Sequence, residues 1–208
     1  MPAPIAEHRN NPETESFSES YISEILGQFI DSLQRTQDVQ CLDVGPVCEE
    51  NILFFARRMK RLYICDMFVR LDRELRSGHH PGNVWTHLDY PATSFDGIQL
   101  WDLCDHLDDH EAARLLKLCH MMLKPEGLLM FVAFEEQKAP GSVNSFVIGS
   151  DYRIHFRCQT HLNLPWYLRH NRALMSLLAN FDHLKSFRYR SGLREFLLKK
   201  PFPFADKA

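Results

Sequence analysis

The stretch VQCLDVGPVCEENILFFARRMKRLYICD, residues 39–66, decides the fold of this chain. It opens with a short apolar run, 39–45, that ends in glycine, and it closes with a second apolar run, 61–66, that ends in aspartate. Between them, residues 49–60 show apolar positions at helical spacing and two acids in the first turn, where the helix dipole favours negative charge. A strand, a helix and a strand in this order form the building unit of a parallel sheet.

The same alternation continues along the chain. We expect further elements in the order helix, strand, strand, helix and strand, over 67–78, 83–90, 95–101, 108–123 and 127–136. The last of these strands is apolar throughout, as central parallel strands are. This pattern predicts an α/β fold of the doubly wound, Rossmann-like kind with a mostly parallel sheet.

The flanking regions follow other patterns. Residues 1–16 are polar and proline-containing, which predicts a disordered tail, so that 17–208 form a single domain. Ser16 and Glu19 are spaced as a capping box, which predicts a helix with four apolar residues on one face, Tyr21, Ile25, Phe29 and Leu33.

The C-terminal third is expected to contain an irregular stretch, 137–164, and a helix over 166–180. Two β-like runs, 183–191 and 193–201, follow with only Gly192 between them, and this short connection allows them to pair as antiparallel strands.

Composition narrows the class of protein. The chain has 208 residues, of which 45% are hydrophobic and 25% charged, which is the usage of a globular domain. The six cysteines form no Cys-x-x-Cys pair, so we expect reduced core thiols and no metal site. Neither a secretory signal nor an apolar stretch long enough to cross a bilayer is visible, and we expect a cytoplasmic protein without membrane contact.

Polar side chains gather where the predicted strands end. In an open parallel sheet, ligands bind outside the carboxyl ends of the strands. Those ends here carry several candidates for contact with a ligand, namely Asp43, Gly45, Asp66, Asp89, Tyr90, Trp101 and Asp102. A carboxylate at such a position can accept hydrogen bonds from two ribose hydroxyls. We therefore expect a cofactor-type crevice near Gly45, Asp66 and Trp101.

The order of these segments resembles the class I S-adenosylmethionine-dependent methyltransferases over roughly residues 39–200. The more specific parts are FDGIQLWDLCDHLDD, residues 95–109, and LKPEGL, residues 123–128, which is similar to the family's Leu-Lys-Pro-Gly-Gly turn. LREF, residues 193–196, is similar to the last strand of the family. The resemblance implies a class I methyltransferase-like fold with a C-terminal antiparallel strand pair.

The resemblance also implies a cofactor, S-adenosylmethionine, and roles for named residues. Those near the cofactor would be Asp43, Gly45, Asp66, Met67, Asp89, Tyr90 and Trp101. Gly45 would approach the methionine part, Asp66 the ribose hydroxyls and Met67 the adenine. Asp102, which would face the methyl-transfer site, and His106 are the catalytic candidates, as a base for acceptors that need one.

The chain departs from the family in the loop after the first strand. The second and third glycines of the family fall on Val47 and Glu49, where a side chain adds bulk and negative charge. Two functions stay open as a result. One is methyl transfer to a small or anionic acceptor. The other is a catalytically inactive methyltransferase-like domain that serves in protein interaction or ligand sensing. Neither the acceptor nor the oligomeric state follows from the sequence.

Two segments of opposite charge stand out. Residues 152–172 hold four arginines, three histidines and interleaved aromatic residues without an acid, whereas 89–111 hold seven acids without a lysine or arginine. The basic segment could form a wall for an anionic substrate or nucleic acid, or it could fold against the acidic segment and neutralise it. The formal net charge of −3 argues against nucleic acid as a partner.

Overall fold

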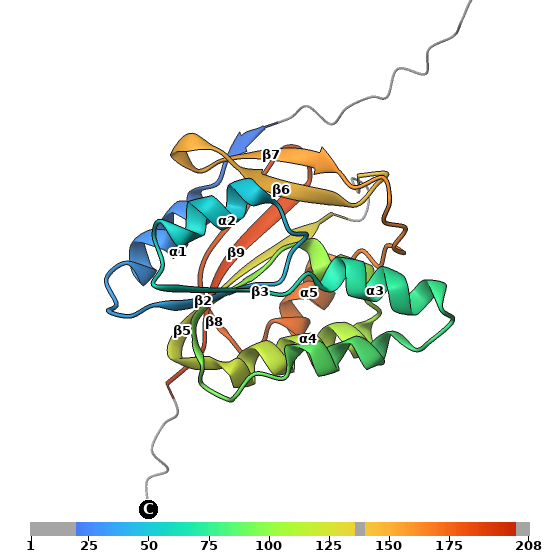
Figure 1. Ribbon diagram of the computed structural model, residues 1–208, viewed down its shortest axis with the longest axis horizontal. Coiled ribbons are helices and arrows are strands. Elements are labelled where there is room, and N and C mark those ends of the chain that lie inside the picture. Colours follow the sequence, from blue (N-terminus) through green and yellow to red (C-terminus); the bar gives the residue numbers. More distant parts are fainter. Residues whose placement is uncertain (1–19, 136–139, 203–208) are drawn as a thin grey trace, which may run out of the picture.

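A computed structural model describes residues 20–135 and 140–202 of the chain (Figure 1). The predicted tail, 1–16, and the proposed capping pair of Ser16 and Glu19 lie outside the described residues. The main sheet has six strands in the order β3-β2-β4-β5-β9-β8. Their bounds are β2 Gln40–Asp43, β3 Arg61–Ile64, β4 Phe95–Leu100, β5 Leu123–Phe134, β8 Asp182–Arg188 and β9 Leu193–Lys199.

Strand direction agrees with the prediction. β3, β2, β4 and β5 are parallel neighbours, β9 runs antiparallel to β5, and β8 runs antiparallel to β9. The two C-terminal runs on either side of Gly192 therefore pair as expected. This confirms the α/β, mostly parallel sheet with a C-terminal antiparallel pair.

Helices cover both faces of the sheet (Figure 1). One face carries α1 (Glu24–Leu33) and α2 (Glu49–Ala56), and the other carries α3 (Met67–Arg76), α4 (Asp109–Met122) and α5 (Asn171–Leu177). Each face has its own buried apolar cluster, because every central strand buries side chains in both directions. Burial of these two clusters is the main source of stability.

A second, three-stranded antiparallel sheet was not predicted. It consists of β1 (Tyr21–Ile22), β7 (Arg153–Cys158) and β6 (Asn144–Ile148), and we call it the cap sheet. The prediction that 137–164 is irregular was wrong for this hairpin. Its turn contains Gly149 and Ser150, but the positive φ values, 54° and 57°, fall on Asp151 and Tyr152.

The predicted strand over 83–90 was also wrong. Residues Pro81–Leu88 form a 3₁₀ helix, with the ring nitrogen Nδ1 of His80 accepting from the Gly82 N–H, 3.0 Å away. Val84, Trp85 and Leu88 are buried while Thr86 is exposed, which is helical rather than alternating spacing. The indole N–H of Trp85 donates to Glu111 of α4. As a consequence, β3 is an edge strand of the described sheet.

Two helix predictions need smaller corrections. The first helix begins at Glu24, because the Ser23 hydroxyl caps the Leu26 N–H at 2.9 Å, and Tyr21 therefore lies in β1 instead of on the helix face. The helix expected over 166–180 forms only over Asn171–Leu177. In the segment before it, Pro165 is exposed, but its carbonyl points inward and accepts a hydrogen bond from Nδ1 of the buried His106 at 2.8 Å.

All six cysteines are free thiols, and five are buried as small core residues, with Cys158 exposed. In the described part of the chain, no helix combines the length and the apolar character needed to cross a bilayer.

Asn51 of α2 holds the cap sheet to the domain. Its side-chain amide donates to the Phe146 carbonyl at 2.8 Å, and its side-chain oxygen accepts from the Ile148 N–H at 2.8 Å. Asn51 is buried, so it extends the edge of β6 as a neighbouring strand would.

We predict that Asn51→Ala destabilises the protein by about 1–3 kcal/mol, because two buried backbone groups of β6 lose their partners. Urea unfolding at neutral pH measures this change. Asn83→Ala, at an exposed position, is the matched control and should change the free energy of unfolding by less than about 0.5 kcal/mol. Equal effects of the two substitutions would contradict the role given to Asn51.

Candidate functional site

Trp101 lies directly on Gly45 at the carboxyl ends of β4 and β2. A Cβ atom built on Gly45 would overlap the indole ring, so only glycine permits this contact. The indole N–H donates to Oδ1 of Asp43 at 2.9 Å, and the Gly45 N–H donates to the same oxygen at 3.0 Å. Trp101 is 1% exposed and Asp43 6% exposed. The indole thus fills the space in front of the first strand end.

The cap sheet closes this arrangement from the other side. The ring of Phe146, on β6, stacks on the indole of Trp101 with 5.0 Å between centroids and 15° between planes. Asn51 holds the backbone that follows Phe146, through the Phe146 carbonyl and the Ile148 N–H. Sequence analysis missed Phe146 and Asn51. The run FVI, residues 146–148, is rich in strand-forming residues and is followed by the turn residues Gly149, Ser150 and Asp151, and this is the signal that could have indicated the strand.

The loop between β2 and α2 has a backbone conformation that residues other than glycine can adopt. Neither Gly45 nor any residue of 46–49 has a positive φ, so Val47 and Glu49 sit there without backbone strain. Both side chains point to the surface, with Val47 49% exposed. The departures from the family's glycine pattern are therefore accommodated by the fold.

Asp66, the residue expected at the ribose, has internal partners. Its Oδ1 caps α3 by accepting from the Val69 N–H at 3.0 Å, and its Oδ2 accepts from the Val47 N–H at 3.1 Å. Asp66 therefore ties the altered loop to the start of α3, and each carboxylate oxygen already accepts one hydrogen bond.

The remaining residues expected around the adenine are dispersed. Met67, the first residue of α3, is fully buried in the core. Asp89 is exposed at the end of the 3₁₀ helix Pro81–Leu88. Tyr90 packs edge-on against Tyr63 and Phe95, with centroids 5.9 and 5.1 Å away. Of the seven predicted cofactor contacts, the structure brings together Asp43, Gly45 and Trp101, and it links Asp66 to their loop through Val47.

Asp102 directly follows Trp101 and begins a buried 3₁₀ helix, Asp102–His106, which His106 ends. Nε2 of His106 is 3.8 Å from Oδ2 of Asp102, and both side chains are completely buried. Within the described residues neither Asp102 oxygen accepts a hydrogen bond. Burial lowers the pKa of His106, but the nearby carboxylate of Asp102 outweighs it, so that the pKa is raised overall.

Asp105 belongs to the same buried turn. Its Oδ2 accepts from the Phe134 N–H at 2.6 Å, at the end of β5. Burial raises the pKa of Asp105 to about 7, although the Phe134 N–H opposes the shift. Burial likewise raises the pKa of Asp43 to about 6. The site therefore contains two carboxyl groups that change charge near neutral pH.

Part of the basic segment packs on this acidic turn. The Arg169 guanidinium is buried, and it donates to the Cys104 and Leu107 carbonyls at 2.7 and 2.8 Å and to Asp109 at 2.9 Å. The Tyr167 N–H donates to the Asp105 carbonyl at 2.6 Å. For residues 165–169, folding against the acidic segment is therefore the observed arrangement.

The arrangement around Gly45 does not fit the methionine part of S-adenosylmethionine. That part would need the space next to Gly45, which the Trp101 ring fills. Oδ1 of Asp43 already accepts hydrogen bonds from the Trp101 indole and from the Gly45 N–H. The described residues also show no group of three or more histidine, cysteine or acidic side chains arranged for a metal ion.

Comparison with solved structures identifies the fold. The chain is similar to an S-adenosylmethionine-dependent methyltransferase from Methanosarcina mazei, with 14% identity, a TM-score of 0.55, and coverage of 87% of this chain and 99% of the other. For an S-adenosylmethionine-dependent methyltransferase from Mesorhizobium loti, the identity is 12%, the TM-score 0.55 and the coverage 84% and 96%. The structure thus has the class I methyltransferase fold.

The same fold also appears in a protein named for other chemistry. The chain is similar to the [4+2]-cyclase SpnF, with 14% identity, a TM-score of 0.51, and coverage of 85% of this chain and 80% of the other. No protein-family model and no curated protein matches the chain by sequence. At identities this low, the similarity shows the fold alone, and function depends on the residues of the site.

We predict that Gly45→Ala destabilises the wild-type protein by about 1–3 kcal/mol, because the new methyl group overlaps the Trp101 indole. In a Trp101→Ala background the same change should cost less than about 1 kcal/mol. A double-mutant cycle measured by urea unfolding gives the coupling. An equal cost of Gly45→Ala in both backgrounds would show that the indole does not occupy this space.

The raised pKa values predict that stability falls as pH rises. Asp105, with a folded-state pKa of about 7 against about 3.9 unfolded, binds more protons in the folded state between these values. Its contribution is fully present below about pH 4 and is lost as pH rises through 7. The raised pKa values of Asp43 and His106 act in the same direction.

We expect the free energy of unfolding to fall by about 2–4 kcal/mol between pH 5 and pH 8, as followed by urea titration at each pH. Asp105→Asn should reduce this slope, since the amide does not titrate and its oxygen can still accept from the Phe134 N–H. Asp31→Asn, at an exposed position, should leave the slope unchanged. A slope that survives in Asp105→Asn would rule out Asp105 as a main contributor.

Proposed function

We propose that this chain is a catalytically inactive methyltransferase-fold module that acts through protein contacts. One observation carries the proposal, namely that the indole of Trp101 occupies the space in front of Gly45 where the cofactor's methionine part would bind. The stacked ring of Phe146 and the two hydrogen bonds from Asn51 hold this closure in place.

Trp101 is held in this position by packing and by a hydrogen bond. A fully buried tryptophan contributes several kcal/mol through packing alone, and here it also makes a buried hydrogen bond to Asp43. Displacing it would leave the Asp43 carboxylate with one donor fewer in a buried place. Cofactor binding would have to compensate for this cost as well as supply its own affinity.

Methyl transfer is the competing function. Its support is the class I methyltransferase fold and the location of Asp102 and His106 in the buried turn that begins directly after Trp101. The buried Asp102 carboxylate, whose oxygens accept no hydrogen bond in the described residues, suits a polar group of a ligand or water. Methyl transfer nevertheless requires the cofactor first, so binding decides between the two functions.

We also propose that the protein is cytoplasmic. The support is that all six cysteines are free thiols, as is usual in a reducing compartment.

Calorimetric titration with S-adenosylmethionine and S-adenosylhomocysteine tests the proposal. We expect no binding by the wild-type protein at millimolar ligand. Val47→Gly with Glu49→Gly, which restores the family's glycines, should still not bind, because Trp101 remains on Gly45. Adding Trp101→Ala to that pair should produce measurable affinity for the cofactor. Circular dichroism checks that each variant is folded, and Trp101→Leu replaces Trp101→Ala if the latter is not.

Two results would overturn the proposal. Micromolar binding by the wild-type protein would show that Trp101 moves aside and would favour methyl transfer. Binding restored by the two glycines alone would show that the loop, and not the indole, prevents it.

A further inference from the structure

We infer that residues 162–169 form a strap over the buried pair of Asp102 and His106, and that a proton shared by this pair keeps the strap closed. Release of the strap as pH rises would open the pair to solvent and solutes. This role goes beyond the proposed function, which concerns the cofactor site at Gly45.

The strap is an extended segment that belongs to no helix or strand. Its residues alternate between inside and outside, so that Leu162 and Leu164 are buried while Asn163 and Pro165 are exposed. The Asn163 N–H donates to Oδ1 of Asp72, on α3, at 2.9 Å. The strap is therefore held by contacts with other elements and not by a strand ladder or a helix of its own.

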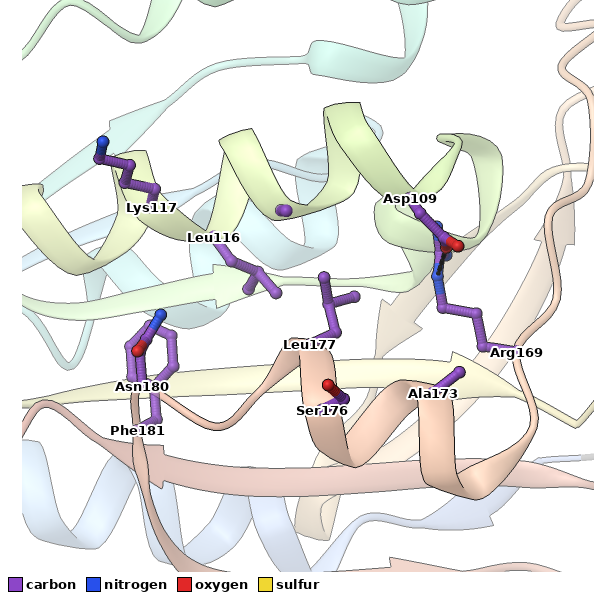
Figure 2. A pocket seen from close by; sticks show the side chains of 10 residues that line it. Asp109, Leu116, Lys117, Arg169, Ala173, Ser176, Leu177, Asn180 and Phe181 are labelled. Carbon is purple, nitrogen blue, oxygen red and sulfur yellow. Dashed lines mark hydrogen bonds and ion pairs between the residues drawn. The ribbon is translucent and has the colours of Figure 1, made fainter.

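Both ends of the strap are held by arginines, which stay protonated at every pH at which a protein is folded. Near one end, Arg76 of α3 donates to the His161 carbonyl at 2.5 Å. At the other end, the buried Arg169 guanidinium donates to two backbone carbonyls of the turn after β4 and reaches Asp109 at the start of α4 (Figure 2). These ends are fixed points between which the middle of the strap can move.

The middle of the strap rests on His106. Nδ1 of His106 is 2.8 Å from the Pro165 carbonyl oxygen, and the Trp166 ring lies against the imidazole with 4.2 Å between centroids. The Tyr167 N–H donates to the Asp105 carbonyl beside this contact. A cavity of about 20 Å³ borders His106, Pro165 and Tyr167, so the strap is not close-packed on the turn at this point.

These contacts fix the tautomer of His106. Because a carbonyl can only accept, Nδ1 carries a hydrogen and donates to Pro165. Nε2 then either carries a second proton and attracts the Asp102 carboxylate, 3.8 Å away, or presents its lone pair to that carboxylate. Within the described residues no hydrogen bond reaches Nε2 or either Asp102 oxygen. Loss of the proton therefore leaves buried acceptors facing each other, which destabilises the closed strap.

Groups from every neighbouring element face His106 or its cavity. Uncharged rings come from α3 and from the strap, namely Phe68 and Trp166. The charged and titratable groups are Asp102 and Asp105 in the same turn, Asp108 and Glu111 at the start of α4, and Arg169 and Arg194 beside Asp105.

The direction of the pH effect follows from the pKa of His106. Burial alone would lower this pKa, but Asp102, with the Pro165 carbonyl and Asp105, raises it overall. The closed strap therefore binds the proton more tightly than an open strap, in which the pKa of His106 would return to about 6.5. The proton's contribution to closure is fully present below that pH and is lost as pH rises through the raised pKa.

Amide hydrogen exchange of the full chain, followed by NMR at each residue, tests the strap. The reporter is the Tyr167 N–H, because the strap must open to break its bond to the Asp105 carbonyl. We expect its protection factor, corrected for intrinsic exchange at each pH, to fall about tenfold or more between pH 5.5 and pH 8.5. At each pH it should stay below the protection of β5 amides, which exchange when the sheet unfolds.

Two variants separate the pair from the neighbouring carboxyl group. Asp102→Asn should remove the pH dependence at Tyr167, because an amide can donate to Nε2 of a neutral His106 at any pH. Asp105→Asn is the matched control. It should keep the dependence, with its midpoint at lower pH because one negative charge near His106 is gone.

The Cε1–H NMR signal of His106 in the wild-type protein gives a second readout, which serves also if Asp102→Asn does not fold. Its titration midpoint should match the midpoint of the change at Tyr167.

Several results would overturn the strap. One is a Tyr167 protection factor that does not change with pH, or that equals the protection of the β5 amides at every pH. Others are a pH dependence that persists in Asp102→Asn or disappears in Asp105→Asn. The last is a His106 midpoint that differs from the Tyr167 midpoint by more than about one pH unit, which is a tenfold difference in proton affinity.

Discussion

The contact between the Trp101 indole and the Cα of Gly45 is the constraint on which the candidate site depends. Because glycine has no Cβ, the ring can lie against the backbone at the end of β2 and donate to Asp43. Phe146 then stacks on the free face of the indole, and Asn51 holds the strand that carries Phe146. A glycine that the methyltransferase pattern associates with ligand approach is used here for internal packing.

Fold and site separate cleanly in this protein. The sheet and its two apolar clusters involve residues buried between strands and helices, and their packing needs no ligand. The departures from the family pattern at Val47 and Glu49 are confined to a surface loop without positive φ. Such a fold can keep its architecture while its crevice closes, because the packing of the sheet does not depend on the crevice.

Much of the fold could be predicted because its signals are local. Residues 39–66 alternate between strand and helix patterns, and the structure forms β2, α2 and β3 there. The failures have local causes too. Residues 83–90 looked like a strand, but Val84, Trp85 and Leu88 are buried while Thr86 is exposed, which is a helical pattern. The cap sheet was missed although Gly149, Ser150 and Asp151 mark a turn, because β6 lacks the polar and apolar alternation of a half-buried strand.

The sequence by itself determined the class of fold, the mostly parallel sheet and the position of Gly45, Asp66 and Trp101 after the ends of its strands. It also showed that the glycine loop had changed. Only the tertiary structure decided that an indole ring fills the space at Gly45. The direction of the Trp101 ring depends on Phe146, which follows it by 45 residues in the sequence. Hydrophobic periodicity reports which face of an element is buried, whereas the partner that fills a crevice is set by contacts between distant segments.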